Sequence, residues 1–240
     1  DIHSTVTYSE DAGKTFNTML PYFGIHPDHH AWWIHPEDAN LIIEGNDGGI
    51  GISRDRGKTW VFDEKLPAGQ FYHINVDNEM PYNVMGGMQD NGSWHGPAYT
   101  WTNGGIRNYY WNNVGGGDGF DVMPDGDGWV YSMSQGGNVG RVNYKTGERW
   151  NIRPPYPGTD EKNVYRFNWN AAIAQDPFDK NAIYYGSQHV HRSNNKGVSW
   201  ETISPDLTTN DSAKMDQSTT GGLTLDITGA ETYGTILTIE

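Results

Sequence analysis

The chain has 240 residues, of which 16 are basic and 30 acidic, so its net charge is −14. A protein this acidic is repelled by phosphate backbones and anionic bilayers, which argues against nucleic-acid binding and membrane-surface binding. No apolar run approaches the roughly 18 residues of a membrane span, and the absence of cysteine excludes disulfides, cysteine–zinc sites and thiol nucleophiles.

An octet of the form Ser-x-Asp-x-Gly-x-Thr-aromatic begins at Ser9 and returns at Ser53. A third copy at Ser193 has Asn in place of Asp and Ser in place of Thr. Two partial copies of the octet, at 143–150 and at Thr100-Trp101, keep the closing aromatic residue. The closing aromatic residues, spaced 41 to 50 positions apart, are Phe16, Trp60, Trp101, Trp150 and Trp200. A period of this length with short β runs inside it predicts propeller blades of four strands each.

The segments between the octets also read as antiparallel strands. Turns rich in Pro, Asp and Asn, such as residues 35–40, separate short runs of aromatic and β-branched residues. No stretch shows helical periodicity, so we expect an all-β fold with very little helix. The predicted units are a partial blade at 1–20, blades at about 21–66, 67–105, 118–155 and 165–205, and the start of a further blade at 230–240. Because both ends fall inside strand-like runs, we expect about five blades of a larger propeller.

The octet itself is predicted to have a structural role. Its Ser and Asp side chains can accept hydrogen bonds from backbone N–H groups of a tight hairpin. Its glycine permits a left-handed backbone conformation, and its closing aromatic residue can pack between neighbouring sheets. We therefore assign no catalytic or metal-binding role to Ser9, Asp11, Ser53, Asp55 or Ser193.

The octets resemble the Asp-box, or BNR, repeats of sialidases, xyloglucanase-type glycoside hydrolases and sortilin-like receptors. Longer segments such as 30–36, 87–94 and 114–120 resemble large secreted bacterial proteins of the sortilin-like or "glycosyl hydrolase, BNR repeat" type. The resemblance implies a β-propeller that is secreted, extracellular or at the cell surface. Its partners would be a glycan or a protein or peptide ligand, and the rest of its own longer chain or other chains of an assembly.

A candidate site follows from the strand pattern. The predicted turn between the second and third strands of each blade carries a carboxylate or amide, and such turns share one face of a propeller. Glycines around Asp118 would let a ligand approach the backbone. The candidate catalytic residues are Asp47, Asp90 and Asp118. The candidate ligand-binding residues are Gln89, Asn91 and Gln135 in the turns, with Tyr110 and Trp111 at the rim of the same face.

Two functions remain open at this point, and we favour the first. A binding module for a protein, peptide or glycan would use these side chains to hydrogen-bond hydroxyls or amines. A glycoside hydrolase acting on a polysaccharide would need two of the aspartates to face each other, roughly 5–5.5 Å apart if retaining or 6.5–9.5 Å apart if inverting. The arginines are too scattered along the chain for a sialidase site.

No cofactor is expected from the sequence. His29, His30 and His35 are interpreted as hydrogen-bonded strand residues rather than metal ligands, because spacing alone is a poor signal for a metal. A structural Ca²⁺ held by loop Asp and Asn oxygens is conceivable, but no twelve-residue calcium loop is present to support it.

Overall fold

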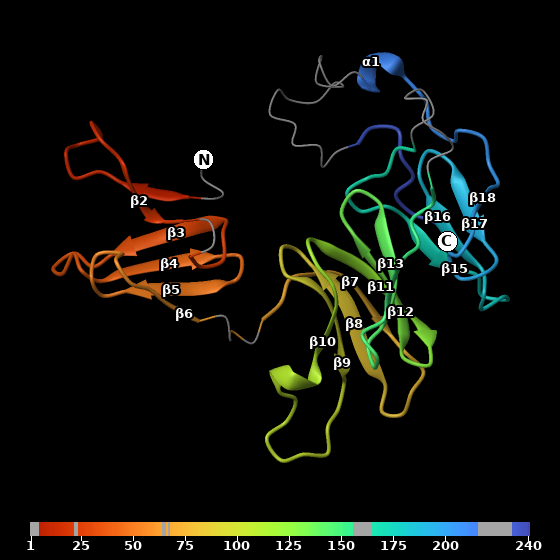
Figure 1. Cartoon of the computed structure of the whole chain (residues 1–240), viewed down its shortest axis with the longest axis horizontal. Helices are drawn as coiled ribbons and strands as arrows, with labels where there is room; N and C mark the ends of the chain where they lie inside the picture. The colour runs from red at the N-terminus through yellow and green to blue at the C-terminus, as the bar shows by residue number, and fades with distance from the viewer. Residues whose placement is uncertain (1–4, 22–23, 64–65, 67, 156–164, 216–231) are drawn as a thin grey trace. The chain divides into compact units, whose positions relative to one another are not determined.

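The computed structural model describes residues 5–21, 24–63, 66, 68–155, 165–215 and 232–240 (Figure 1). Contacts divide the chain into two compact units, Asp1–Gly69 and Gln70–Glu240. The described residues are almost entirely strands and turns. Their helical elements are the single-turn 3₁₀ helix η1 (Asn108–Tyr110) and the four-residue helix α1 (Ser212–Met215). In the described part of the chain, no helix has the length and apolar character needed to cross a membrane.

The first unit contains two antiparallel sheets, drawn in red and orange in Figure 1. A two-stranded sheet pairs β1 (Val6–Tyr8) with β2 (Asn17–Leu20). It falls within the predicted partial blade, of which residues 1–4 lie outside the described residues. The second sheet has four strands in consecutive order, namely β3 (His29–Ile34), β4 (Ile42–Asn46), β5 (Gly49–Ser53) and β6 (Val61–Asp63).

The second unit contains three further sheets, each of four antiparallel strands in consecutive order. The first comprises β7 (Phe71–Val76), β8 (Asn83–Met88), β9 (Gly92–Pro97) and β10 (Asn112–Gly115). The second comprises β11 (Gly119–Gly126), β12 (Trp129–Ser134), β13 (Asn138–Asn143) and β14 (Arg149–Asn151). The third comprises β15 (Ile173–Gln175), β16 (Ile183–Gly186), β17 (Val190–Ser193) and β18 (Glu201–Thr202). These sheets confirm the predicted all-β fold of four-stranded propeller blades.

The core of the second unit lies between successive sheets rather than within one of them. One apolar layer joins the β7–β10 sheet to the β11–β14 sheet through Met85, Val114, Val122, Val130 and Val142. A larger layer of aliphatic and aromatic residues joins the β11–β14 sheet to the β15–β18 sheet. Between β8 and β11 the backbones approach so closely that a Cβ atom at Gly87 would overlap the backbone of Gly119.

Each octet holds its own hairpin together, as the sequence predicts. In the second octet, the Ser53 hydroxyl accepts the N–H of Gly57 at 2.7 Å, and the Asp55 carboxylate accepts the N–H of Thr59 at 2.8 Å. Hydrogen bonds from Thr59 are the main reason why the pKa of Asp55 is lowered to about 2. The same two bonds recur from Gly13 to Ser9, from Thr15 to Asp11, from Gly197 to Ser193 and from Ser199 to Asn195.

The outer strand of the β7–β10 sheet differs from the prediction. β10 lies beyond residue 105, the position at which the sequence predicts this blade to end. Trp101 lies in the loop between β9 and β10 and is 84% exposed, whereas Trp111 directly precedes β10. Trp111 therefore holds the place that Trp60 and Trp200 hold before β6 and β18. The assignment of Trp101 to the repeat was wrong because this loop inserts extra residues, which a fixed period cannot reveal.

The predicted further blade at 230–240 is described only from residue 232 onward. The backbone N–H of Ile236 donates to the carbonyl of Ser187 at 2.8 Å, so this segment contacts the end of the β15–β18 sheet. No strand is assigned among residues 232–240. This further blade, and the residue boundaries predicted for the other blades, remain a proposal.

Candidate functional site

In the second unit, the turns between second and third strands carry polar residues as predicted. Gln89, Asp90 and Asn91 join β8 to β9, and Gln135 begins the turn from β12 to β13. Asp118 directly precedes β11, and the pairing of Gly119 with Ser134 places it beside that second turn. We use the name turn edge for the edge of the second unit formed by Gln89, Asp90, Asn91, Asp118 and Gln135. The structure thus brings five of the eight predicted site residues to one edge.

Asp118 is a buried brace at the centre of the turn edge. It is only 8% exposed. One carboxylate oxygen accepts the backbone N–H of Asp90 at 2.9 Å, and the other accepts the indole N–H of Trp169 at 2.7 Å. Asp118 therefore connects the β8–β9 turn, the start of β11 and the segment that precedes β15. Each of its oxygens accepts one hydrogen bond from a neighbouring segment, which fixes the orientation of the carboxylate.

Tyr72 is an aromatic residue that contacts the turn edge and that sequence reasoning missed. Its hydroxyl donates to the side-chain oxygen of Gln89 at 3.0 Å, and its ring packs on Phe120 with 4.6 Å between ring centroids. Burial, and then the nearby carboxylates of Asp118 and Asp90, raise the pKa of Tyr72. The hydroxyl therefore remains a hydrogen-bond donor at neutral pH, while 39% of the residue is exposed.

The inner strands are irregular where they begin at the turn edge. The pairing of β7 with β8 shifts register between Phe71 and His73, and the pairing of β11 with β12 shifts between Gly119 and Val122. Such bulges bend a strand and redirect its side chains, and they are frequent beside functional sites. The residues redirected here include Tyr72. In the first unit, β3 has a similar shift, between His29 and Ala31.

A histidine beside the turn edge is oriented by residues from two neighbouring blades. His73 Nδ1 lies 2.9 Å from Asp121 Oδ2, and His73 Nε2 lies 3.3 Å from the amide nitrogen of Asn170. The His73 side chain is 44% exposed, and that of Asp121 is 17% exposed. With the amide as donor to Nε2, His73 carries its proton on Nδ1 and donates it to the carboxylate. The group presents a fixed imidazole and a partly exposed carboxylate to a ligand.

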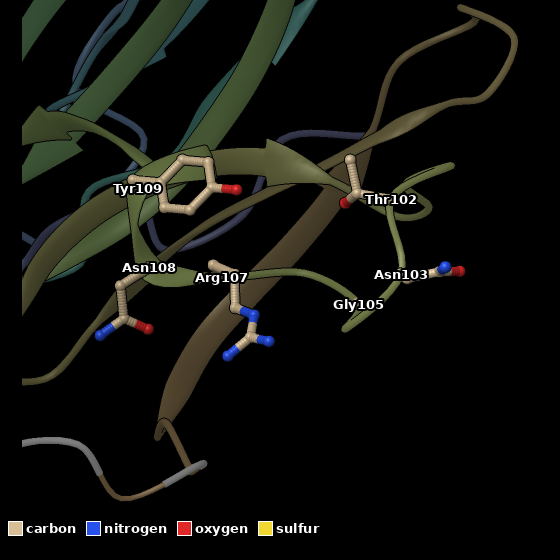
Figure 2. A pocket seen from close by; sticks show the side chains of 6 residues that line it. All are labelled: Thr102, Asn103, Gly105, Arg107, Asn108 and Tyr109. Carbon is tan, nitrogen blue, oxygen red and sulfur yellow. The ribbon is translucent and has the colours of Figure 1, made fainter.

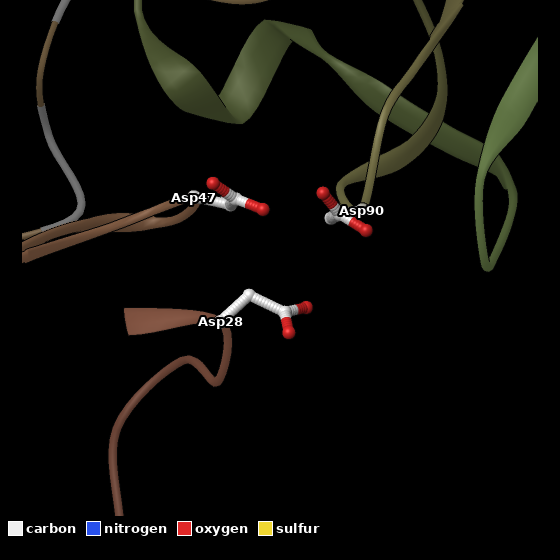
Figure 3. Close-up of side chains that lie close together, drawn as sticks. All are labelled: Asp28, Asp47 and Asp90. Atoms are coloured by element: carbon white, nitrogen blue, oxygen red, sulfur yellow. The ribbon is translucent and has the colours of Figure 1, made fainter. Parts of the chain in front are cut away.

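Asp47 lies in the first unit, in the turn between β4 and β5. Its carboxylate is 3.0 Å from Nε2 of His30. Figure 3 shows it with Asp28, which precedes β3, and oxygen atoms of the two carboxylates lie within 4.8 Å of each other. A divalent cation can bridge two carboxylates, but calcium takes about six to eight oxygen ligands, so this pair by itself does not define a metal site. That Asp47 shares one face with Asp90 and Asp118 stays a prediction.

Among the described residues of the first unit, His29 and His35 are hydrogen bonded, as the sequence predicts. His29 pairs with Glu44, which is fully buried in β4. His35 accepts the backbone N–H groups of Glu37 and Asp38 through Nδ1, at 3.1 Å each. The buried Glu44 was missed by sequence reasoning, because it occupies an ordinary position in an apolar strand.

Tyr110 and Trp111 do not lie at the turn edge, so that part of the prediction was wrong. β10 pairs with β9 such that residue 112 lies opposite His95 and residue 115 lies opposite Ser93. Because β9 begins at the turn edge, the start of β10 lies at the opposite end of the sheet. The loop that carries Tyr110 and Trp111 joins the third strand to the fourth, and not one blade to the next. It forms a pocket of its own (Figure 2).

The sequence contains a signal for the residues that were missed. Tyr72 and His73 stand at the start of a predicted first strand, as does Asp121, and Trp169 and Asn170 precede another. Aromatic and polar residues at the same position of successive blades would have indicated side chains gathered at one edge.

No family model matches the chain, and no curated protein matches it. Among solved structures, a GH74 xyloglucanase from Xanthomonas campestris is 16% identical with a TM-score of 0.39, and the match covers 86% of this chain and 35% of that one. An extracellular domain from B. thetaiotaomicron is 11% identical with a TM-score of 0.39, covering 84% and 27%. YCF48 bound to D1 peptide is 15% identical with a TM-score of 0.34, covering 82% and 60%.

The chain thus spans about a third of the xyloglucanase and about a quarter of the extracellular domain. Likeness at this level concerns the fold and not the function. The blades and the turn edge define the class of the protein as a β-propeller module.

Proposed function

We propose that this chain is a binding module whose ligand occupies the turn edge of the second unit. The observation that carries the proposal is the state of Asp118, whose two oxygens are bonded to Asp90 and Trp169. One of the three candidate catalytic carboxylates is thus tied to two neighbouring segments of the fold. Beside it, Tyr72 and His73 are partly exposed on a bulged strand, an arrangement suited to recognising a ligand.

The chemistry of the turn edge supports a peptide or protein segment with a Lys or Arg side chain as the ligand. Asp90 and Asp121 supply negative charge, Gln89 supplies an amide, and the ring of Tyr72 offers a face to a cation. The net charge of −14 would attract a basic segment toward the protein.

The glycoside hydrolase remains the alternative, with weaker support. That chemistry requires two opposed carboxylates, one of which donates and accepts a proton during the reaction. Each oxygen of Asp118 already accepts one hydrogen bond, and the residue is only 8% exposed, which disfavours it as the carboxyl group that transfers this proton. Hydrolysis would therefore rest on the other two candidate carboxylates, Asp47 and Asp90.

Binding can be tested with the full chain on an array of peptides of varied charge. We expect binders enriched in Lys and Arg, and an affinity about tenfold weaker in Tyr72→Ala and in Asp121→Asn, the loss of about 1.4 kcal/mol of contact. Val76→Ala is the matched control, because Val76 lies on the same strand at the far end and is 52% exposed. Its affinity should equal that of the wild type.

The same protein should be incubated with soluble polysaccharides and assayed for reducing sugars. If the wild type releases sugar and Asp90→Asn does not, the hydrolase would replace the binding proposal. Peptide affinities that are equal in the wild type, Tyr72→Ala and Asp121→Asn would show that the ligand does not occupy the turn edge.

We also propose that the octets are Asp-box repeats and that the module is extracellular. The recurrence of the same backbone-to-side-chain bonds in all three octets supports the first point. The resemblance of the sequence to secreted bacterial proteins supports the second. Detection of the protein outside the cells of its source organism would test the location.

A further inference from the structure

The loop between β9 and β10, residues 98–111, gathers exposed aromatic side chains at the end of the sheet opposite the turn edge. Tyr99 is 52% exposed, Trp101 84% and Tyr109 75%. Large aromatic residues so exposed on one loop usually mark a binding surface. Arg107 is the only charged residue of this loop, in a chain with 30 acidic residues.

Hydrogen bonds and ring contacts within the loop order its aromatic residues, and the rings of Tyr99 and Trp101 pack edge to face with 4.9 Å between centroids. The hydroxyl of Tyr110 lies 3.4 Å from that of Thr100 and 3.0 Å from that of Thr102. The rings of Tyr109 and Tyr110 pack together, with 4.4 Å between their centroids. The backbone N–H of Ala98 donates to the carbonyl of Tyr82, directly before β8, at 3.1 Å. A surface held in this way loses less conformational entropy when it binds a ligand.

The pocket of this loop is lined by polar groups and one aromatic face (Figure 2). It is an open depression with a volume of about 560 Å³. The lining residues are Thr102, Asn103, Gly105, Arg107, Asn108 and Tyr109. They supply hydroxyl, amide and guanidinium groups, and none of them is a carboxylate. The guanidinium lies against Gly104, where a side chain would displace it.

We propose that this loop is a second binding site, independent of the turn edge, and that its ligand is a neutral saccharide. The C–H face of a sugar ring would stack on Trp101 or Tyr109, while its hydroxyls would bond to Asn103, Arg107 and Asn108. A polyanionic glycan is disfavoured because the protein as a whole carries a charge of −14. An apolar protein surface is disfavoured because the pocket beside Tyr109 is lined by amides and a guanidinium, which such a surface would leave unpaired.

The test is electrophoresis of the full chain in native gels that contain galactomannan, hydroxyethyl cellulose or laminarin, with alginate as the acidic probe. We expect at least one neutral polysaccharide to retard the wild type. Trp101→Ala and Tyr109→Ala should each weaken the interaction about five- to tenfold, the scale of a lost aromatic contact. Phe178→Ala is the control, because Phe178 is likewise an exposed aromatic residue (97%) on a different blade. This variant should be retarded as strongly as the wild type.

Asp121→Asn distinguishes this site from the turn edge, since it should leave polysaccharide retardation unchanged while it weakens peptide binding. Three results would overturn the inference. The first is that no neutral polysaccharide retards the protein, and the second is that alginate alone does so. The third is that the wild type and Trp101→Ala are retarded equally.

Discussion

Asp118→Asn should destabilise the second unit although it preserves the size of the side chain. Two donors converge on the carboxylate, namely the backbone N–H of Asp90 at 2.9 Å and the indole N–H of Trp169 at 2.7 Å. An asparagine has only one acceptor oxygen, and its NH₂ group is a donor. One of the two donors would therefore lose its partner and face another donor.

The magnitude follows from burial and charge. A hydrogen bond to a charged group contributes about 1.5–3 kcal/mol, and a buried donor left without a partner costs about 1–3 kcal/mol. Asp118 is 8% exposed, so water has little access to replace the lost bond. We expect Asp118→Asn to lower the free energy of unfolding by about 2–4 kcal/mol, and Trp169→Phe, which removes one donor, to lower it by about 1–2 kcal/mol.

The two substitutions should not be additive. In the double variant, the single amide oxygen of the introduced asparagine can accept the N–H of Asp90, and no indole N–H faces its NH₂ group. The double variant should thus cost less than the two single variants together. Urea unfolding followed by circular dichroism measures all four free energies. A change below about 0.5 kcal/mol in Asp118→Asn, or strict additivity, would refute the brace and return Asp118 to the candidates for catalysis.

Three further outcomes are expected. Asp55→Asn should keep its hairpin, because Asn195 accepts the corresponding backbone N–H in the third octet. Since the pKa of Asp55 falls from 3.8 to about 2 on folding, the stabilisation by its carboxylate is present above about pH 4 and is lost toward pH 2. Melting curves of the variant should lack this acid-sensitive part. Gly87→Ala should lower the free energy of unfolding by at least about 2 kcal/mol, because the new methyl group overlaps the backbone of Gly119, and an unchanged melting temperature would contradict that close approach. Threonine hydroxyls bonded to its oxygen lower the pKa of Tyr110 to about 8, so a spectroscopic titration should show one tyrosinate forming near pH 8, and a curve identical in Tyr110→Phe would contradict the assignment.

The blades could be predicted from the sequence because their determinants are local. The bonds from Gly57 to Ser53 and from Thr59 to Asp55 each span four residues, so the residues of one octet are sufficient to determine the hairpin. The spacing of successive octets then predicts the length of a blade. The same argument failed at Trp101, where a loop inserted between the third and fourth strands moves the closing aromatic residue to Trp111.

The turn edge could be located from the sequence only in part. The presence of a polar residue in each second-to-third turn is a local property, and Gln89, Asp90 and Gln135 stand where it places them. Their roles are not local. Asp90 and Asp118 are the same residue type in similar glycine-rich surroundings, and nothing in these surroundings predicts that Asp118 accepts bonds from two neighbouring segments.

The sequence by itself therefore determined the all-β class, the four-stranded blade and the octet hairpins, because hydrogen bonds within a few residues set them. Tertiary structure alone decided that Asp118 is a brace and that His73 is oriented by Asp121 and Asn170. The partners of Asp118 are 28 and 51 residues away, and Asn170 is 97 residues from His73. Such contacts depend on how one blade packs on the next and on where a bulge redirects an inner strand. Neither is set by the residues that precede or follow these side chains in the chain.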